Sequence, residues 1–356
     1  MRIRMSGGKT ENQQAVATWL FVCTAMIALM VVIGGATRLT GSGLSITEWN
    51  LVMGTVPPLN EGQWGEVFDQ YKKSPEYQLV NAGMTMSEFK SIFWWEYVHR
   101  LIGRTVGFVF LFPCLYFVVR RRITKKQGMK LLLLFLLGGA QGVLGWYMVK
   151  SGLVKHPEVS HFRLTAHLTL AFLLFGATLW QGLQFKTDRF PKAQPGDKGG
   201  GKLWRISVAL MALVMLQVAL GAMVAGLKAG YMFNTFPKMG EHWVPPGMGY
   251  HFLMNGVAIQ FCHRMTAYLV LIAVVLLWWK SRNSVLSARQ RNGFDFILLA
   301  VLIQFTLGVF TLLFHVPVLL GVLHQFGALV LFGGTVFLCH SLCLGNRASP
   351  SAPTAS

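Results

Sequence analysis

The chain has 356 residues, of which 53% are hydrophobic and only 13% are charged, and its formal net charge is +19. A soluble domain typically has about 25% charged residues, so this composition cannot cover a globular surface with polar groups. The basic excess would suit either nucleic acid or a membrane protein. The positions of the basic residues decide between the two.

Long apolar runs alternate with short polar stretches, and each run approaches the ~20 residues that cross a bilayer as a helix. Charged residues are almost absent from these runs, and Pro317 marks the break between the last two. We therefore expect an all-α integral membrane protein with eight transmembrane helices. The expected spans are 16–36, 92–119, 130–149, 164–185, 205–226, 253–279, 294–314 and 318–340.

Most of the Lys and Arg residues lie in alternate connections: in both tails and after the second, fourth and sixth spans. The positive-inside rule predicts that both termini and these connections are cytoplasmic. Because these basic residues belong to short loops on one membrane face, with little aromatic interleaving, we expect no nucleic-acid partner. The first span is long and no cleavage site follows it, which favours a retained helix over a signal peptide.

The longest connection, 37–91, is on the outer side and carries many of the acidic residues, so we expect it to be functional or folded in its own right. The five Cys lie in or at the edges of spans, which predicts no disulfide framework. The sequence Cys-x-x-Cys-His does not occur, and this excludes covalent haem attachment.

Two halves of the chain repeat the same signals in the same order. His99-Arg100 matches His263-Arg264, the segment 141–145 matches 304–308, and a third His follows in each half, all at a nearly constant offset. Each half crosses the membrane an even number of times, so we expect two tandem, pseudo-symmetric four-helix bundles. The expected units are an N-terminal half 1–190, a cytoplasmic linker 191–202, a C-terminal half 203–346 and a disordered tail 347–356.

Four His residues lie a few residues inside the outer ends of spans: His99, His167, His263 and His324. Ionisable groups inside a membrane are costly and indicate function, and the repeated pairs favour this over hydrogen-bonded core residues. Zinc or copper would need further ligands, whereas two His from facing helices suit the axial positions of a haem iron. We expect the other His, including His340 at the inner end of the last span, to be solvated or interfacial.

Glu96 lies three residues before His99 and shares its helix face, whereas the corresponding residue before His263 is Gln260. An ionisable acid belongs where protons move, so the N-terminal half is the candidate for chemistry and the C-terminal half for a permanent haem. The alternative role of Glu96 is an ion pair with Arg100 at i+4.

Five arginines near the outer ends of spans are candidates for binding haem propionates. Lipid phosphate is an equally good partner for an arginine at a membrane boundary. The five are Arg38, Arg100, Arg104, Arg163 and Arg264.

With these residues in view, the chain resembles the haem A synthase family over nearly all of 16–340. The first outer loop lacks the Cys pair of some members, so the resemblance is to the proteobacterial and mitochondrial type. It rests on Gly34–Thr40, Gly43–Ser45, Tyr71–Pro75, Met84–Lys90, Glu96–Arg100, Gly226–Gly230, Asn234–Gly240, His263-Arg264 and His324-Gln325.

The resemblance implies an oxidoreductase that converts the C8 methyl group of haem O to a formyl group, by successive hydroxylations and loss of water from a gem-diol. The product, haem A, serves cytochrome oxidases. It also implies that His99 and His167 flank haem O, that Glu96 is required nearby, and that His263 and His324 ligate haem b.

The sequence shows no transit peptide, so we expect a bacterial inner membrane, with the haem sites toward the periplasm. Haem O synthase, cytochrome oxidase assembly factors and a second copy of the chain are candidate partners, besides membrane lipid.

Two other functions stay open at this point. A di-haem b-type cytochrome that passes electrons to or from quinone explains four His, but it gives no reason for Glu96 in one half alone. A duplicated transporter could use the His residues as a proton relay. For an oxidase, two His ligands leave the iron no vacant position, so either one ligand dissociates or oxidising equivalents arrive by another route.

Overall fold

The protein is represented by a computed structural model that describes residues 4–47, 56–152, 157–187, 200–249 and 251–346. Within these residues, eight helices are long and apolar enough to cross a membrane, which confirms the predicted all-α, multi-pass class. The predicted tail 347–356 and most of the predicted linker lie outside the described residues. The eight helices are α1 (Arg4–Leu39), α4 (Met86–Val119), α5 (Lys125–Gly152), α6 (His161–Thr187), α7 (Gly200–Gly226), α8 (Gly256–Arg282), α9 (Ala288–Leu313) and α10 (Val318–Asn346).

Polar caps set where several of these helices begin. Thr85 and Glu88 form a reciprocal capping box at the start of α4, and Ser287 with Gln290 does the same for α9. The side chain of Asn255 accepts from two backbone N–H groups of α8. Each cap supplies partners for N–H groups that have none within the helix.

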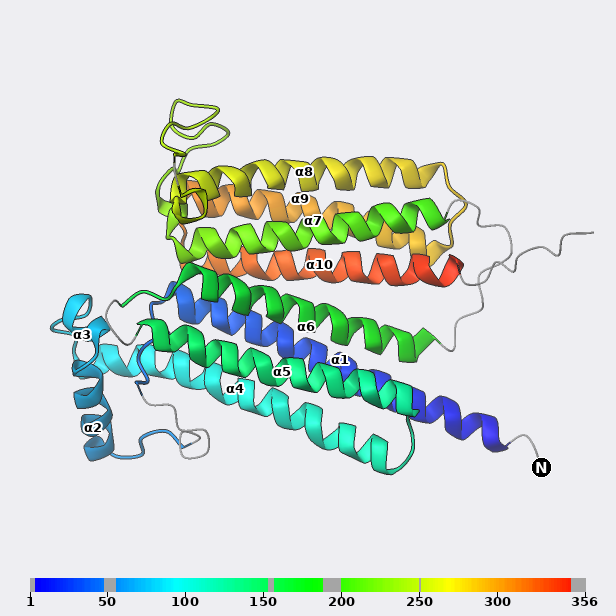
Figure 1. Cartoon of the computed structure of the whole chain (residues 1–356), viewed down its shortest axis with the longest axis horizontal. Helices are drawn as coiled ribbons and strands as arrows, with labels where there is room; N and C mark the ends of the chain where they lie inside the picture. The colour runs from blue at the N-terminus through cyan, green and yellow to red at the C-terminus, as the bar shows by residue number, and fades with distance from the viewer. Residues whose placement is uncertain (1–3, 48–55, 153–156, 188–199, 250, 347–356) are drawn as a thin grey trace, which may run out of the picture.

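The long helices form two groups that lie side by side (Figure 1). Helices α1, α4, α5 and α6 pack together, and α7, α8, α9 and α10 form the other group. The groups meet where α6 contacts α7 and α10 and where α1 contacts α10. At this contact the rings of Phe172 and Phe332 lie with centroids 5.8 Å apart, so apolar packing extends from one group into the other.

The long connection after α1 is folded, as expected for its length. It contains α2 (Glu61–Lys72) and α3 (Pro75–Leu79), which lie at the end of the molecule away from the N-terminus (Figure 1). An aromatic cluster fixes them to the first turns of α4, and we call α2, α3 and this cluster the outer cap. The cluster consists of Trp64, Phe68, Tyr71, Phe89, Phe93 and Tyr97.

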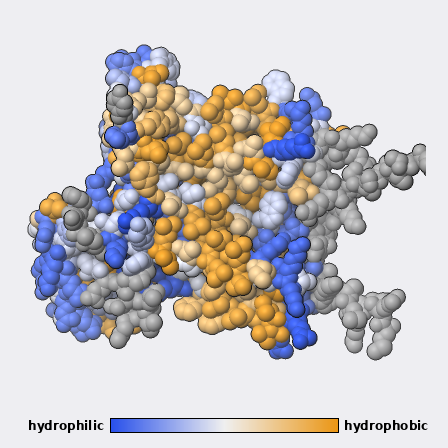
Figure 2. Space-filling view, viewed as in Figure 1, coloured by the Kyte–Doolittle hydropathy of each residue, from blue (hydrophilic) through white to orange (hydrophobic). Residues whose placement is uncertain are grey.

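The second group has a shorter cover at the same end. It comprises the 3-10 turns η2 (Ala229–Tyr231) and η3 (Phe252–Met254) and the loop between them. Many apolar side chains of the membrane helices are exposed, among them Phe112, Leu133 and Leu136. They form an apolar band with hydrophilic residues at both ends (Figure 2), and this is the surface that contact with lipid tails requires.

Candidate functional site

Each of the four predicted His residues packs against a glycine on another membrane helix. His99 of α4 faces Gly34 of α1, and the other three pairs join α6 to α5, α8 to α7 and α10 to α9. Because glycine has no Cβ, the ring can approach the neighbouring backbone closely. A Cβ built on the glycine would lie 3.0 Å from the ring Cε1 in Gly34–His99, Gly145–His167 and Gly221–His263, and 2.8 Å from it in Gly308–His324.

A glutamine from the neighbouring helix holds three of these His residues. Its side-chain Nε2 donates to the backbone carbonyl of the His at 2.9–3.0 Å and lies 3.1–3.4 Å from a ring nitrogen. The pairs are Gln141–His167, Gln217–His263 and Gln304–His324. These glutamines orient the rings, and they were not among the predicted site residues.

The structure brings His263 and His324 together as one of the predicted pairs, with ring centroids 6.4 Å apart and planes at 83°. His99 on α4 and His167 on α6 both lie in the first helix group. Among the described residues, no group of three or more His, Cys, Asp and Glu is placed to hold a metal ion. Each candidate site therefore offers two imidazoles.

The His263–His324 pair fits the axial ligands of a haem iron. Two metal–nitrogen bonds of about 2 Å each, together with the radius of each ring, span about 6 Å between centroids, which matches the observed 6.4 Å. Nδ1 of His263 is buried without a hydrogen-bond partner, so this ring has a nitrogen available.

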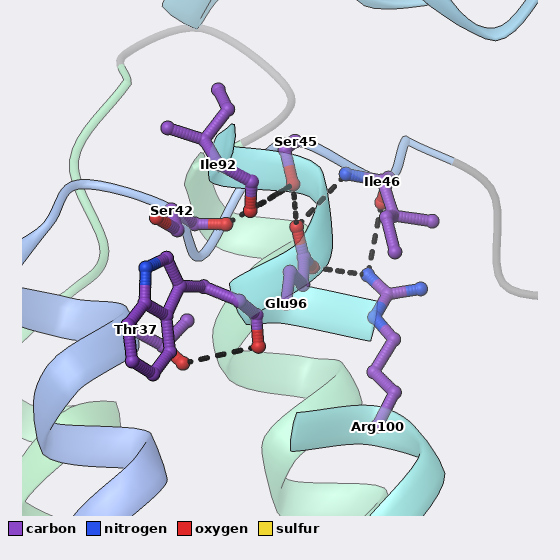
Figure 3. Close-up of polar contacts among 8 residues, drawn as sticks. Thr37, Ser42, Ser45, Ile46, Ile92, Glu96 and Arg100 are labelled. Atoms are coloured by element: carbon purple, nitrogen blue, oxygen red, sulfur yellow. Dashed lines mark hydrogen bonds and ion pairs between the residues drawn. The ribbon is translucent and has the colours of Figure 1, made fainter. Parts of the chain in front are cut away.

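Glu96 is buried, with 3% of its side chain exposed, and all three of its hydrogen-bond partners are donors (Figure 3). Oε2 accepts from the hydroxyl of Ser45 at 2.7 Å and from the backbone N–H of Ile46 at 2.8 Å. Oε1 forms an ion pair with Arg100 at 2.6 Å. The ion pair considered as the alternative role of Glu96 is therefore present. Glu96 also fastens the start of the long outer connection to α4.

The corresponding contacts in the second group lack the acid. Nη2 of Arg100 donates to the Ile46 carbonyl at 2.9 Å, and Nη2 of Arg264 donates to the Phe233 carbonyl at 2.7 Å. Gln260, in the position of Glu96, donates to that same Phe233 carbonyl at 3.0 Å. In each group, then, the residue three before the His and the arginine after it hold an outer loop in place. Only the first group places an ionisable acid there.

Two of the other candidate arginines, Arg38 and Arg163, also donate to backbone carbonyls. Arg38 donates to the Ala225 carbonyl at 3.3 Å, across the two helix groups. Arg163 donates to the Tyr147 carbonyl at 2.7 Å and stacks 3.6 Å from the Tyr147 ring centroid. Arg104 lies half-buried on α4, one turn after Arg100. The guanidinium groups of Arg38 and Arg163 each have five N–H donors, more than these carbonyl contacts use.

The prediction for His340 was wrong. We expected a solvated or interfacial residue, but His340 is only 1% exposed. Its ring packs edge-on against Trp180, with centroids 4.9 Å apart. The reason is that α6 covers the inner part of α10, a contact between distant segments that the local sequence does not reveal.

Comparison with known proteins agrees with the resemblance seen in the sequence. Residues 17–336 match the family described as "Cytochrome oxidase assembly protein". The chain is 46% identical over 341 residues to the "Heme A synthase" of Nitrosospira multiformis, covering 94% of this chain and 95% of the relative. It is 45% identical over 341 residues to that of Parvibaculum lavamentivorans (94% and 96% covered), and 42% over 339 residues to that of Nitrosomonas eutropha (94% and 95%). The chain therefore belongs to the cytochrome oxidase assembly protein family that includes these haem A synthases.

Proposed function

We propose that the protein is a haem A synthase, a membrane oxidoreductase that converts the C8 methyl group of haem O to the formyl group of haem A. One observation carries the proposal: two His pairs lie in similar glycine-lined settings, but only one has a buried acid one turn away, at Glu96. This asymmetry suits one reacting site and one permanent haem, in a chain whose relatives are named for haem A synthesis.

In this proposal His263 and His324 would hold a resident haem b, which when bound supplies one-electron redox chemistry. His99 and His167 flank the iron of the substrate haem O, and the apolar helices around them accommodate its hydrocarbon tail. Arg38, Arg100, Arg104, Arg163 and Arg264 are the proposed partners of the anionic propionates.

Glu96 is the proposed proton acceptor when the methyl group is oxidised and water is lost. Its Oε1 accepts from Arg100 at 2.6 Å, and the second lone pair of this oxygen can take the proton. Its Oε2 keeps Ser45 and Ile46 in place over the outer end of α4, which helps to exclude water from the site. In this proposal, Oε1 of Glu96 accepts the proton and Oε2 anchors the loop.

The same proposal includes the cellular location of the protein and the division of the chain into two units. The basic connections support cytoplasmic termini, which puts the His sites toward the periplasmic face of a bacterial inner membrane. The equivalent Gly–His and loop contacts of the two helix groups support a tandem, pseudo-symmetric pair of units, 1–190 and 203–346. Haem O synthase, oxidase assembly factors and a second copy of the chain remain the proposed partners.

Co-expression with a haem O synthase tests the proposal, followed by chromatography of the extracted haems. We expect haem A from the wild-type chain, and none from Glu96→Gln, which should retain haem b. Glu66→Gln, the same change at an exposed acid of α2, is the matched control and should still yield haem A. Absence of haem A from the wild type, with haem b present, would favour an electron-transferring di-haem cytochrome instead.

The melting temperature separates chemistry from anchoring at Glu96. Gln can still accept from Ser45 and Ile46, but it loses the buried ion pair with Arg100, so Glu96→Gln should melt below the wild type. The haem A yield is therefore compared among protein samples that are folded and carry haem b, and we expect none from Glu96→Gln. A variant that loses haem A only in proportion to a large fall in melting temperature would reduce Glu96 to a structural ion pair with Arg100.

A further inference from the structure

Three of the four His residues are held by a glutamine, and the fourth is not. In α5, α7 and α9 the glutamine stands one turn before the glycine that faces the His ring, at Gln141–Gly145, Gln217–Gly221 and Gln304–Gly308. In α1 the residue one turn before Gly34 is Met30. Met30 therefore has the same position relative to His99 that a glutamine has relative to each of the other three His rings.

The glutamines fix both the ring and its helix turn. Each donates to the His backbone carbonyl and places its amide beside a ring nitrogen. The side-chain oxygens of Gln141, Gln217 and Gln304 are buried without partners, so each amide can also offer an acceptor. Groups that hydrogen-bond a metal-ligating His set its orientation and raise its basicity, and their loss typically weakens metal binding by about 10–100-fold.

Met30 cannot hydrogen-bond His99 in the way that the glutamines hydrogen-bond the other three His residues. Its terminal methyl packs toward α4, where a Cβ built on Gly103 would lie 3.4 Å from it. A thioether has no hydrogen to donate and is a weak acceptor. In the described part of the chain, Nδ1 is buried without a hydrogen-bond partner in His99, as it also is in His167 and His263. The difference is that a glutamine amide lies beside Nε2 of His167 and His263, whereas Met30 has no such amide. His99 is thus positioned by packing against Gly34, without the amide that the other rings have.

We propose that His99 is the ligand that dissociates from the iron of haem O and opens a coordination position there. The inference rests on the proposed function, because it takes haem O to lie between His99 and His167. Only the coordinate bond between the iron and the ring nitrogen breaks, the nitrogen keeps its electron pair, and no electron is transferred. His167, held by Gln141, stays bound, and His263 and His324 keep haem b closed to small ligands.

Carbon monoxide binding to the reduced, full-length protein loaded with haem O tests this, read from the optical difference spectrum. In the wild type, we expect carbon monoxide to bind to haem O and not to haem b. Met30→Gln should supply a hydrogen bond that holds His99, and it should slow carbon monoxide binding to haem O on the order of tenfold. Met30→Leu, which has no donor, is the matched control and should bind carbon monoxide as the wild type does.

Gln304→Met removes the glutamine that holds His324 in the proposed haem b site. This variant should allow carbon monoxide to bind haem b. Unchanged binding in Met30→Gln, or equal slowing in Met30→Leu, would overturn the proposal even if haem A is still made. A protein that binds haem b but no haem O, whatever residue 30 is, would contradict the proposed function itself and the inference with it.

Discussion

The side-chain amide of Gln325 donates a hydrogen bond to the backbone carbonyl of Val31 at 2.8 Å. Gln325 follows His324 on α10, and Val31 follows Met30 on α1, so this bond joins the two helix groups at the level of the His sites. Gly35, one turn after Val31, lies directly against the same glutamine side chain. The turn of α1 that faces His99 and the residue after His324 are therefore in direct contact.

Gly35→Ala should destabilise this junction. The new Cβ would lie 2.5 Å from Oε1 of Gln325, so the glutamine must move, and overpacking of this kind costs about 1–3 kcal/mol. We expect a lower melting temperature for the purified protein. Gly107→Ala in α4 is the control, because a Cβ there meets nothing within 4 Å. Equal melting temperatures for the two variants would contradict the role given to Gly35.

Gly221→Ala should weaken the retention of haem b. A Cβ at this position would lie 3.0 Å from Cε1 of His263 and push the ring off its position, which we expect to lower haem affinity on the order of tenfold. The haem-to-protein ratio after purification measures the effect. Gly142→Ala in α5, where a Cβ has open space, should keep its haem. Full haem b content in Gly221→Ala would remove His263 from the haem site.

The eight membrane helices were predictable because length and apolarity are local properties of the sequence. The predicted start of the last span, at 318, is the start of α10 at Val318. The prediction for α4 began at 92, whereas the helix begins at Met86. The difference arises because the Thr85–Glu88 capping box starts the helix outside the apolar run, where its aromatic face packs on the outer cap.

The candidate site was predictable only in part. Glu96 and the four His residues stood out because ionisable groups are rare in so apolar a chain. The roles of the glutamines and facing glycines depend on which helices are neighbours, and one sequence does not state this. The repeated Gln-x-x-x-Gly spacing was the available signal. The loop contacts of Arg100 and Arg264 could not be anticipated, because their partners are backbone carbonyls of Ile46 and Phe233.

Glu76 is a second buried acid, located in α3 of the outer cap, with 7% of its side chain exposed. Tyr71 of α2 donates to its Oε2 at 3.4 Å. Burial raises the pKa of Glu76 to about 7, and the nearby negative charge of Glu96 adds to this, while the Tyr71 hydrogen bond and the positive charge of Arg38 act in the opposite direction. The folded outer cap therefore favours the protonated carboxyl over the carboxylate.

The outer cap should loosen as the pH rises. Because the pKa of Glu76 is higher in the folded cap than in an unfolded chain, where it is about 4.3, the stabilisation is fully present below that value and is lost as pH rises through about 7. Hydrogen exchange of α2 and α3, corrected for intrinsic rates, should show falling protection between about pH 5.5 and about pH 8.

Glu76→Gln should flatten this pH dependence and give the outer cap more protection than the wild type near pH 8. Glu66→Gln should keep the wild-type slope, since Glu66 is exposed. An unchanged slope in Glu76→Gln would show that another group controls the pH response of the cap.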